Sequence, residues 1–216
     1  MQECDPFFFQ GCDPATDSFM FFSFQDTPAN NDRDNQDTYD CQVIVSWPYR
    51  AEFLGRSEPT ETPATSEERL RLMKEITRDW ASPFRDVVQD MPSTSTVQAI
   101  RLEDWPPEEG SWENFDGRAT LVGDAAHAMT MYRGEAANHG ITDVARWLDF
   151  HLPVLKSKER SGGDLKGACD AYEREMIART HLAVLASRQA CLDAHDHERV
   201  NERSPLVSKR APIATA

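Results

Sequence analysis

Two runs of aromatic and β-branched residues predict strands near the start of the chain. They cover residues 17–24 and 41–47, and residues of these types favour extended backbone. The segment between them is acidic and rich in asparagine, which is typical of an exposed loop. We therefore expect an antiparallel pair of strands. The flanks offer little within this chain for the pair to pack against, which indicates that part of its packing surface lies elsewhere.

A capping box and an apolar stripe predict a helix after residue 65. Thr65 and Glu68 have the spacing at which each side chain satisfies the other residue's backbone N–H. The apolar stripe that follows recurs at helical spacing and ends before Pro83. Its members are Leu72, Met73, Ile76 and Trp80.

Two further helices are predicted in the second half of the chain. The first begins near Asn138 and ends before Pro153. The second follows the chain break at 161–163, with Asp164 as its expected cap, and meets no proline before about Asp193. The apolar positions of the first are Ile141, Val144, Ala145 and Leu148, and those of the second are Leu165, Ala168, Cys169, Tyr172 and Met176.

Two shorter apolar runs also predict strands. Residues 97–102 favour a short strand, and residues 118–122 have the pattern of a buried strand that leads directly into Gly123. The chain thus combines strands and helices, and we expect an α/β protein.

Charge and cysteine usage narrow the class of protein. The chain of 216 residues has 23 Lys and Arg against 37 Asp and Glu, a net charge of −14, so nucleic acid and anionic membranes are poor partners. Its 5 cysteines are scattered without CxxC spacing, which argues against a disulfide framework or a structural zinc site. The apolar run at 7–9 is too short for a signal peptide, and no stretch reaches the roughly 20 apolar residues of a membrane span. We therefore expect a cytoplasmic protein.

The segment from Gly117 to Val144 has the residues of a cofactor site. Gly123 allows a ligand to approach the backbone, and Asp124 after a strand is placed to accept hydrogen bonds from sugar-like hydroxyls. The helix that begins near Asn138 offers free N–H groups to a partly anionic ring or phosphate. The alternative is an ordinary turn, because Gly-Asp after a strand is common in turns.

This segment resembles the second FAD-binding motif of the class A flavoprotein monooxygenases of the para-hydroxybenzoate and salicylate hydroxylase type. The family pattern is Gly-Asp-Ala-Ala-His, a short loop, Gly-x-Gly-x-Asn and a helix, which matches 123–127 and 134–138. The resemblance implies that Asp124 binds the ribityl chain of FAD and that the backbone of Ala137 and Asn138 stabilises the flavin edge. The implied cofactor-binding residues are Gly123, Asp124, Gly134, Ala136, Ala137 and Asn138, and the implied loop facing flavin and substrate contains Met129, Met131 and Tyr132.

The chain departs from the family pattern in two ways. Met131 stands where proline is common in the family. Ala136 replaces the second glycine, and alanine adopts a positive φ less readily than glycine and could narrow the space at the edge of the flavin ring. The family also opens with a GxGxxG unit that holds the FAD pyrophosphate, and none of the 10 glycines of this chain forms that pattern. The resemblance is therefore to the C-terminal half only, and residues 46–48 and 187–191 also resemble fungal members of the family.

The resemblance also implies a division of the chain. Residues 1–55 correspond to the end of a substrate-domain β-sheet, 56–115 to a helix and connecting segment, 116–200 to the C-terminal part of the FAD-binding domain, and 201–216 to a tail. The implied fold is α/β, with part of a Rossmann-like layer, part of an antiparallel substrate sheet and a long C-terminal helix.

The function implied is oxygenation of an aromatic or polycyclic small molecule with FAD, NAD(P)H and O2, in fungal secondary metabolism. The sequence indicates no catalytic residue and no metal site, because His195 and His197 are two residues apart and do not share a helix face. His127 and His139 are interpreted as packing or hydrogen-bonding residues rather than acid/base catalysts. Two alternatives stay open. The first is a repurposed protein that acts without FAD as a cyclase or isomerase, or as a partner subunit that completes another chain. The second is an inactive fragment.

Overall fold

The computed structural model describes residues 8–26, 39–159 and 161–208, which form two compact units. The first unit is built from residues up to 101 together with 194–199, and the second from 102–193 and 200 onward. In the described residues, no helix combines the length and the apolar character needed to cross a membrane.

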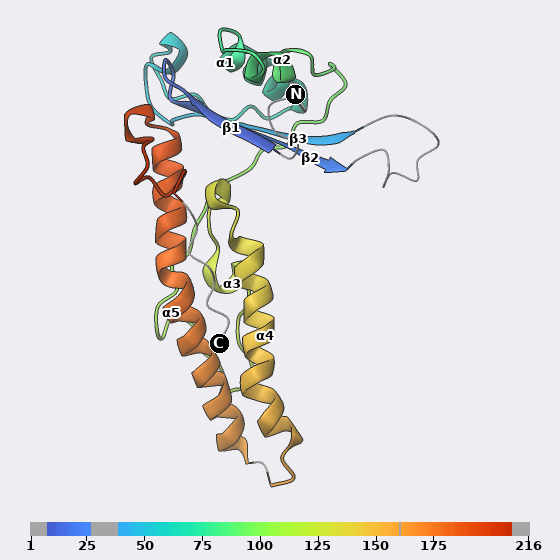
Figure 1. Cartoon of the computed structure of the whole chain (residues 1–216), viewed down its shortest axis with the longest axis vertical. Helices are drawn as coiled ribbons and strands as arrows, with labels where there is room; N and C mark the ends of the chain where they lie inside the picture. Colours follow the sequence, from blue (N-terminus) through green and yellow to red (C-terminus); the bar gives the residue numbers. More distant parts are fainter. Residues whose placement is uncertain (1–7, 27–38, 160, 209–216) are drawn as a thin grey trace, which may run out of the picture. The chain divides into compact units, whose positions relative to one another are not determined.

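An antiparallel sheet forms the centre of the first unit (Figure 1). Its strands are β1 Phe8–Asp13, β2 Ser18–Asp26 and β3 Asp40–Ser46, in the order β1-β2-β3. Phe22 of β2 lies opposite Phe9 and Val43 of its two neighbours. The predicted pairing of β2 with β3 is confirmed, and the loop expected between them at 27–38 lies outside the described residues. β1 was not expected, since its middle residues Gln10 and Gly11 have low strand propensity.

One face of the sheet is covered by the predicted helix α1, Ser66–Thr77. The capping box is present: the side chain of Thr65 accepts a hydrogen bond from the N–H of Glu68, and the Glu68 carboxylate accepts one from the N–H of Thr65. The apolar stripe packs with Met20 and Phe22 of β2 in a buried core. Two short elements, η1 Phe53–Gly55 and α2 Phe84–Gln89, complete this side, and η3 His197–Arg199 also belongs to this unit.

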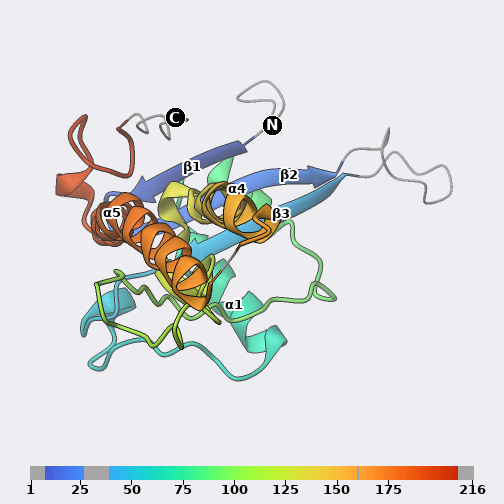
Figure 2. The ribbon, with the colours of Figure 1, turned by 90° about the horizontal axis from the view of Figure 1, so that it is seen from below.

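Two long helices dominate the second unit (Figures 1 and 2). They are α4, Ala136–Lys156, and α5, Gly162–Ala194, and two short elements precede them, α3 Asp124–His127 and η2 Met131–Arg133. Tyr172 and Met176 of α5 pack against Ala126 of α3 in the buried core. The Tyr172 hydroxyl donates a hydrogen bond to the Leu121 carbonyl, which fastens the segment before α3 to α5.

The strands expected at 97–102 and 118–122 are wrong. Neither segment forms a strand, and Arg118, Ala119 and Val122 are exposed rather than buried. Strand-forming residues need a neighbouring strand to complete the backbone hydrogen bonds, and the described part of the second unit, to which 118–122 belongs, contains none.

The boundaries of the two long helices differ from expectation in detail. α4 passes through Pro153 and ends at Lys156. Proline lacks the N–H that would reach the carbonyl four residues earlier, but a single loss near the helix end leaves the last turn in place. Asp164 lies within α5 instead of preceding it, and its carboxylate accepts a hydrogen bond of 2.6 Å from the N–H of Ser161.

The α/β class, the antiparallel sheet and the long C-terminal helix are confirmed. The division at 55, 115 and 200 stays a prediction. The described part of the expected tail, 201–208, is attached to the second unit, because the Ser204 hydroxyl donates to Asp193 and the Pro205 carbonyl accepts from Arg133.

Candidate functional site

The Gly-Asp pair of the motif forms an open turn. Gly123 has φ 59° and ψ −141°, and no atom lies within 4 Å of the position that a Cβ would occupy there. Asp124 then begins α3 with an exposed side chain that forms no hydrogen bond to another described residue. A ligand can therefore contact the Gly123 backbone and the Asp124 carboxylate together.

An open groove of about 460 Å³ extends from Asp124. Two of its lining residues are joined by a hydrogen bond of 2.8 Å from the Trp105 N–H to the Ala128 carbonyl. Asp104 is fixed by Arg188 of α5, whose Nε lies 3.0 Å from both carboxylate oxygens. The groove is lined by Leu102, Glu103, Asp104, Trp105, Asp124, Ala125 and Ala128. Three carboxylates beside small and aromatic side chains suit a hydroxyl-rich or planar ligand and disfavour a phosphate.

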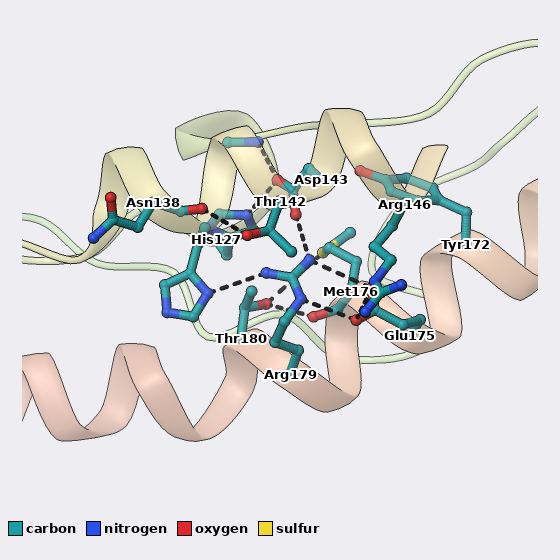
Figure 3. A network of polar contacts seen from close by, with 12 residues as sticks. His127, Asn138, Thr142, Asp143, Arg146, Tyr172, Glu175, Met176, Arg179 and Thr180 are labelled. Carbon is teal, nitrogen blue, oxygen red and sulfur yellow. Dashed lines mark hydrogen bonds and ion pairs between the residues drawn. The ribbon is translucent and has the colours of Figure 1, made fainter. Parts of the chain in front are cut away.

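A buried network of polar side chains contacts the turn at the Gly123 N–H (Figure 3). Its centre is Asp143 of α4, which is fully buried. One oxygen of Asp143 accepts the Gly123 N–H at 2.8 Å and lies 2.6 Å from His127 Nε2. The other accepts a hydrogen bond of 2.6 Å from Arg179 of α5. Three elements of the second unit are thus joined at one carboxylate.

The network keeps Asp143 ionised. Burial by itself raises the pKa of Asp143, but the hydrogen bonds from His127, Arg179 and Gly123 outweigh it and lower the pKa below the ordinary value. A buried carboxylate with these donors is a structural anchor for the Gly123 turn.

Arg179 also connects the network to His139. Its Nη1 lies 3.0 Å from His139 Nδ1, and its Nε donates to Glu175 at 3.0 Å. Burial, followed by the positive charge of Arg179, lowers the pKa of His139. His127 Nδ1 is buried and has no partner among the described residues. Both histidines are buried and lie within hydrogen-bond distance of side chains of the network, and their interpretation as packing or hydrogen-bonding residues stays a prediction.

The second half of the motif places donors at the start of α4. Gly134 takes the left-handed conformation, φ 60°, and the first intrahelical bond runs from the His139 N–H to the Glu135 carbonyl at 3.1 Å. The N–H groups of Ala136, Ala137 and Asn138 precede that bond and are available to a ligand. Ala136 has no positive φ, so alanine in place of the family's glycine strains no backbone here.

The loop between the two halves is fastened to α5. The hydroxyl of Thr130 donates to the Ser187 carbonyl at 2.7 Å, and the Ser187 hydroxyl donates to the Thr130 carbonyl at 2.6 Å. Met129 and Met131 are half-buried, whereas Tyr132 is buried. Arg133 pairs with Glu135 at 2.7 Å.

Several residues of the site carry no signal in the sequence. Asp143 lies inside the motif segment without matching any motif position, and Arg179 comes 36 residues later in the chain, on α5. The acids of the groove wall, Glu103 and Asp104, precede the motif by about 20 residues in an irregular segment. Only the fold brings these residues to the turn.

Comparison with known proteins identifies relatives along nearly the whole chain. No protein-family model matches it. A probable FAD-dependent monooxygenase of Arthroderma benhamiae is 50% identical over 97% of this chain and 49% of its own length. The FAD-dependent monooxygenase tazP of Aspergillus terreus is 39% identical over 69% of this chain and 36% of its own length.

The fold is also found in a solved structure. The 2,6-dihydroxypyridine-3-hydroxylase of Arthrobacter nicotinovorans matches 91% of this chain and 48% of its own with a TM-score of 0.61 at 15% identity. The chain spans about half the length of the curated relatives it matches. It is therefore homologous to the fungal FAD-dependent monooxygenases and corresponds to about half of such a protein.

Proposed function

We propose that this chain is the C-terminal half of an FAD-dependent monooxygenase that oxygenates an aromatic or polycyclic small molecule, in the cytoplasm and with NAD(P)H as reductant. In this proposal the chain contributes the ribityl and flavin-edge contacts of the cofactor site, and the pyrophosphate contacts come from the complementary half. The homology over 97% of the chain supports the family. The observation that carries the cofactor assignment is the exposed Asp124 beside the open Gly123 backbone.

The residues present fit this part of FAD. A ribityl chain offers hydroxyls, and Asp124 is an acceptor whose carboxylate has no competing bond to a described residue. The N–H groups at the start of α4 suit the partly negative edge of a flavin ring. The redox chemistry, reduction by NAD(P)H and activation of O2, would be supplied by the bound flavin.

The same residues do not suit the pyrophosphate. The groove wall carries Glu103, Asp104 and Asp124, and the chain as a whole has a net charge of −14. Phosphates are usually held by a glycine-rich loop at a helix N-terminus, and the sequence has no GxGxxG. Weak flavin binding by the chain alone follows from the proposal.

A flavin titration of two matched variants tests the assignment. Asp124→Asn keeps the size of the side chain but removes the charged acceptor, which contributes about 1.5–3 kcal/mol in such hydrogen bonds. Flavin fluorescence should therefore report binding weaker by about 10-fold or more. Asp116→Asn, at an exposed acid in the same unit but outside the groove lining, should bind as the wild type does.

Equal flavin binding by the two variants would contradict the assignment of Asp124. A chain that turns over a substrate without flavin would instead support the FAD-independent cyclase or isomerase.

A further inference from the structure

α4 exposes a continuous aliphatic stripe to solvent. Five residues at spacings of 3, 4, 4 and 3 lie on one side of the helix, within about 80° of one another at 3.6 residues per turn. We call them the α4 seam, and they are Ile141, Val144, Leu148, Leu152 and Leu155. Ile141 is 71% exposed and Val144 is 53% exposed. Single exposed apolar residues are ordinary, but an aligned row of five is typical of an interface.

The opposite side of α4 faces the core of the second unit and combines aromatic with polar residues: Trp147 and Phe150 pack against that core. His139 and Asp143 are buried on this side, and Asp143 carries the buried network of Figure 3. The helix thus has apolar residues on both sides, whereas the outer side of a surface helix is ordinarily polar. Turning the seam inward would expose Asp143 and break its bonds to Arg179 and His127, so the buried network fixes the outward direction of the seam.

The segment before Gly123 adds backbone that has no backbone partner to the same surface, although the Leu121 carbonyl accepts a hydrogen bond from the Tyr172 hydroxyl. Among the described residues, no backbone–backbone hydrogen bond involves Thr120, Leu121 or Val122, and the Val122 side chain is 44% exposed. This segment has strand-forming residues without a strand partner. It meets the seam where Gly140, the neighbour of Ile141, packs near Gly123: a Cβ on Gly140 would lie 3.6 Å from the Gly123 Cα.

We infer that the α4 seam and the backbone of 120–122 form one docking surface for the complementary half of the monooxygenase fold, which adds a strand beside 120–122 and an aliphatic face over the seam. The chain covers 49% of its Arthroderma benhamiae relative and 48% of the hydroxylase structure, so about half of the fold lies outside it. A second copy of this chain is a poor occupant, because each copy has a net charge of −14. The inference rests on the proposed function only for the identity of the partner.

Co-expression tests the docking surface. The full chain is produced with the part of the Arthroderma benhamiae relative that it does not match, and complex is measured by co-purification without flavin. Wild type should form a complex, and Leu148→Glu in the seam should lower its yield by about 10-fold or more. The matched control is Leu182→Glu on α5, also an exposed leucine, which should retain the complex.

Hydrogen exchange gives the second measurement. On assembly, the amides of residues 120–122 should exchange at least about 10-fold more slowly, because they gain backbone partners. Absence of a complex with the wild type, equal complex with Leu148→Glu, unchanged exchange at 120–122, or a homodimer of this chain that Leu148→Glu disrupts would each overturn the inference.

The two proposals fail separately. A complex that depends on the seam but binds no FAD contradicts the proposed function and retains the docking surface. If flavin binding depends on Asp124 but the chain forms no complex with the complementary half, the docking surface alone is contradicted.

Discussion

At the scale of single residues, one carboxylate determines the geometry of the motif turn. Asp143 is fully buried and is contacted by the Gly123 N–H, by His127 and by Arg179. A buried charge is tolerated when every oxygen has a partner, and removal of either member of such a pair leaves the other uncompensated. The turn that presents Asp124 therefore depends on residues that contact no ligand.

Asp143→Asn should destabilise the second unit by about 1–3 kcal/mol, because Arg179, with 12% of its side chain exposed, loses one of its two carboxylate partners and keeps only Glu175. Urea unfolding followed by tryptophan fluorescence measures the loss. Asp149→Asn is the control, since Asp149 is 64% exposed on the same helix and should change stability by less than about 0.5 kcal/mol. Similar losses for the two variants would show that the buried network adds no stability.

Acid should weaken the second unit in two stages. The pKa of His139 is lowered from its ordinary 6.5, so the folded chain binds this proton less readily than the unfolded chain. The stability from neutral His139 is complete above pH 6.5 and declines as the pH falls through that value. The pKa of Asp143 is also lowered, and its contribution, complete above the ordinary 3.8, is lost as the pH falls further.

The measurement is the free energy of unfolding across this pH range for wild type and His139→Gln. Glutamine keeps a polar side chain beside Arg179 but cannot titrate, so the decline that starts near pH 6.5 should disappear while the decline at lower pH remains. A profile with the same upper decline in both proteins would assign it to another group.

At the scale of elements, a close approach of backbones joins the loop before the motif to α5. Gly117 has φ 79°, and a Cβ there would lie 2.6 Å from the Cα of Lys166. Gly110 has the same φ of 79° but no atom within 4 Å of its Cβ position. The two glycines therefore separate the cost of conformation from the cost of contact.

Alanine at either glycine meets the strain of a positive φ, about 1 kcal/mol or more. Gly117→Ala should cost about 1–3 kcal/mol beyond that, because backbone atoms of α5 must move. Thermal unfolding of the two variants gives the difference directly. Equal melting temperatures would mean that the loop moves away from α5 without cost.

Local sequence signals predicted the elements that depend on local contacts. The capping box of Thr65 and Glu68 and the stripe of α1 were correct, because both act within a few residues. The segment 118–122 was wrong, since a strand depends on a partner from elsewhere in the fold. The spacing in α4 predicted a helix but not that its stripe faces outward, which follows from the contact of Asp143 with Arg179.

The same distinction holds for the candidate site. Gly123 and Asp124 were predicted from their motif, because it is continuous in sequence, and their role stays a prediction. The groove wall at Glu103 and Asp104, and the support from α5, arise from contacts between residues far apart in the chain, which no single sequence displays. Those residues extend the site beyond the motif.

At the scale of the whole molecule, the proposed function gives the chain one part of a cofactor site. The carboxylates of the groove and the donors of α4 suit a ribityl chain and a flavin ring, while the net charge of −14 opposes phosphates. An FAD molecule presents both kinds of group to the same protein. Its affinity for the chain alone is then a balance between local hydrogen bonds and long-range repulsion.

Riboflavin separates these two contributions, because it has the ring and the ribityl chain of FAD without the phosphates. At low salt the chain alone should bind riboflavin more tightly than FAD, since charges interact over about 30 Å at 0.01 M ionic strength. At 0.1 M, where that length falls to about 10 Å, the affinities should converge to within about 3-fold, less than 1 kcal/mol.

Fluorescence titrations of riboflavin and FAD at the two salt concentrations measure this difference in affinity. A preference for FAD at both would reveal phosphate contacts within this chain, whereas a preference for FAD that appears only after assembly would assign the pyrophosphate site to the complementary half.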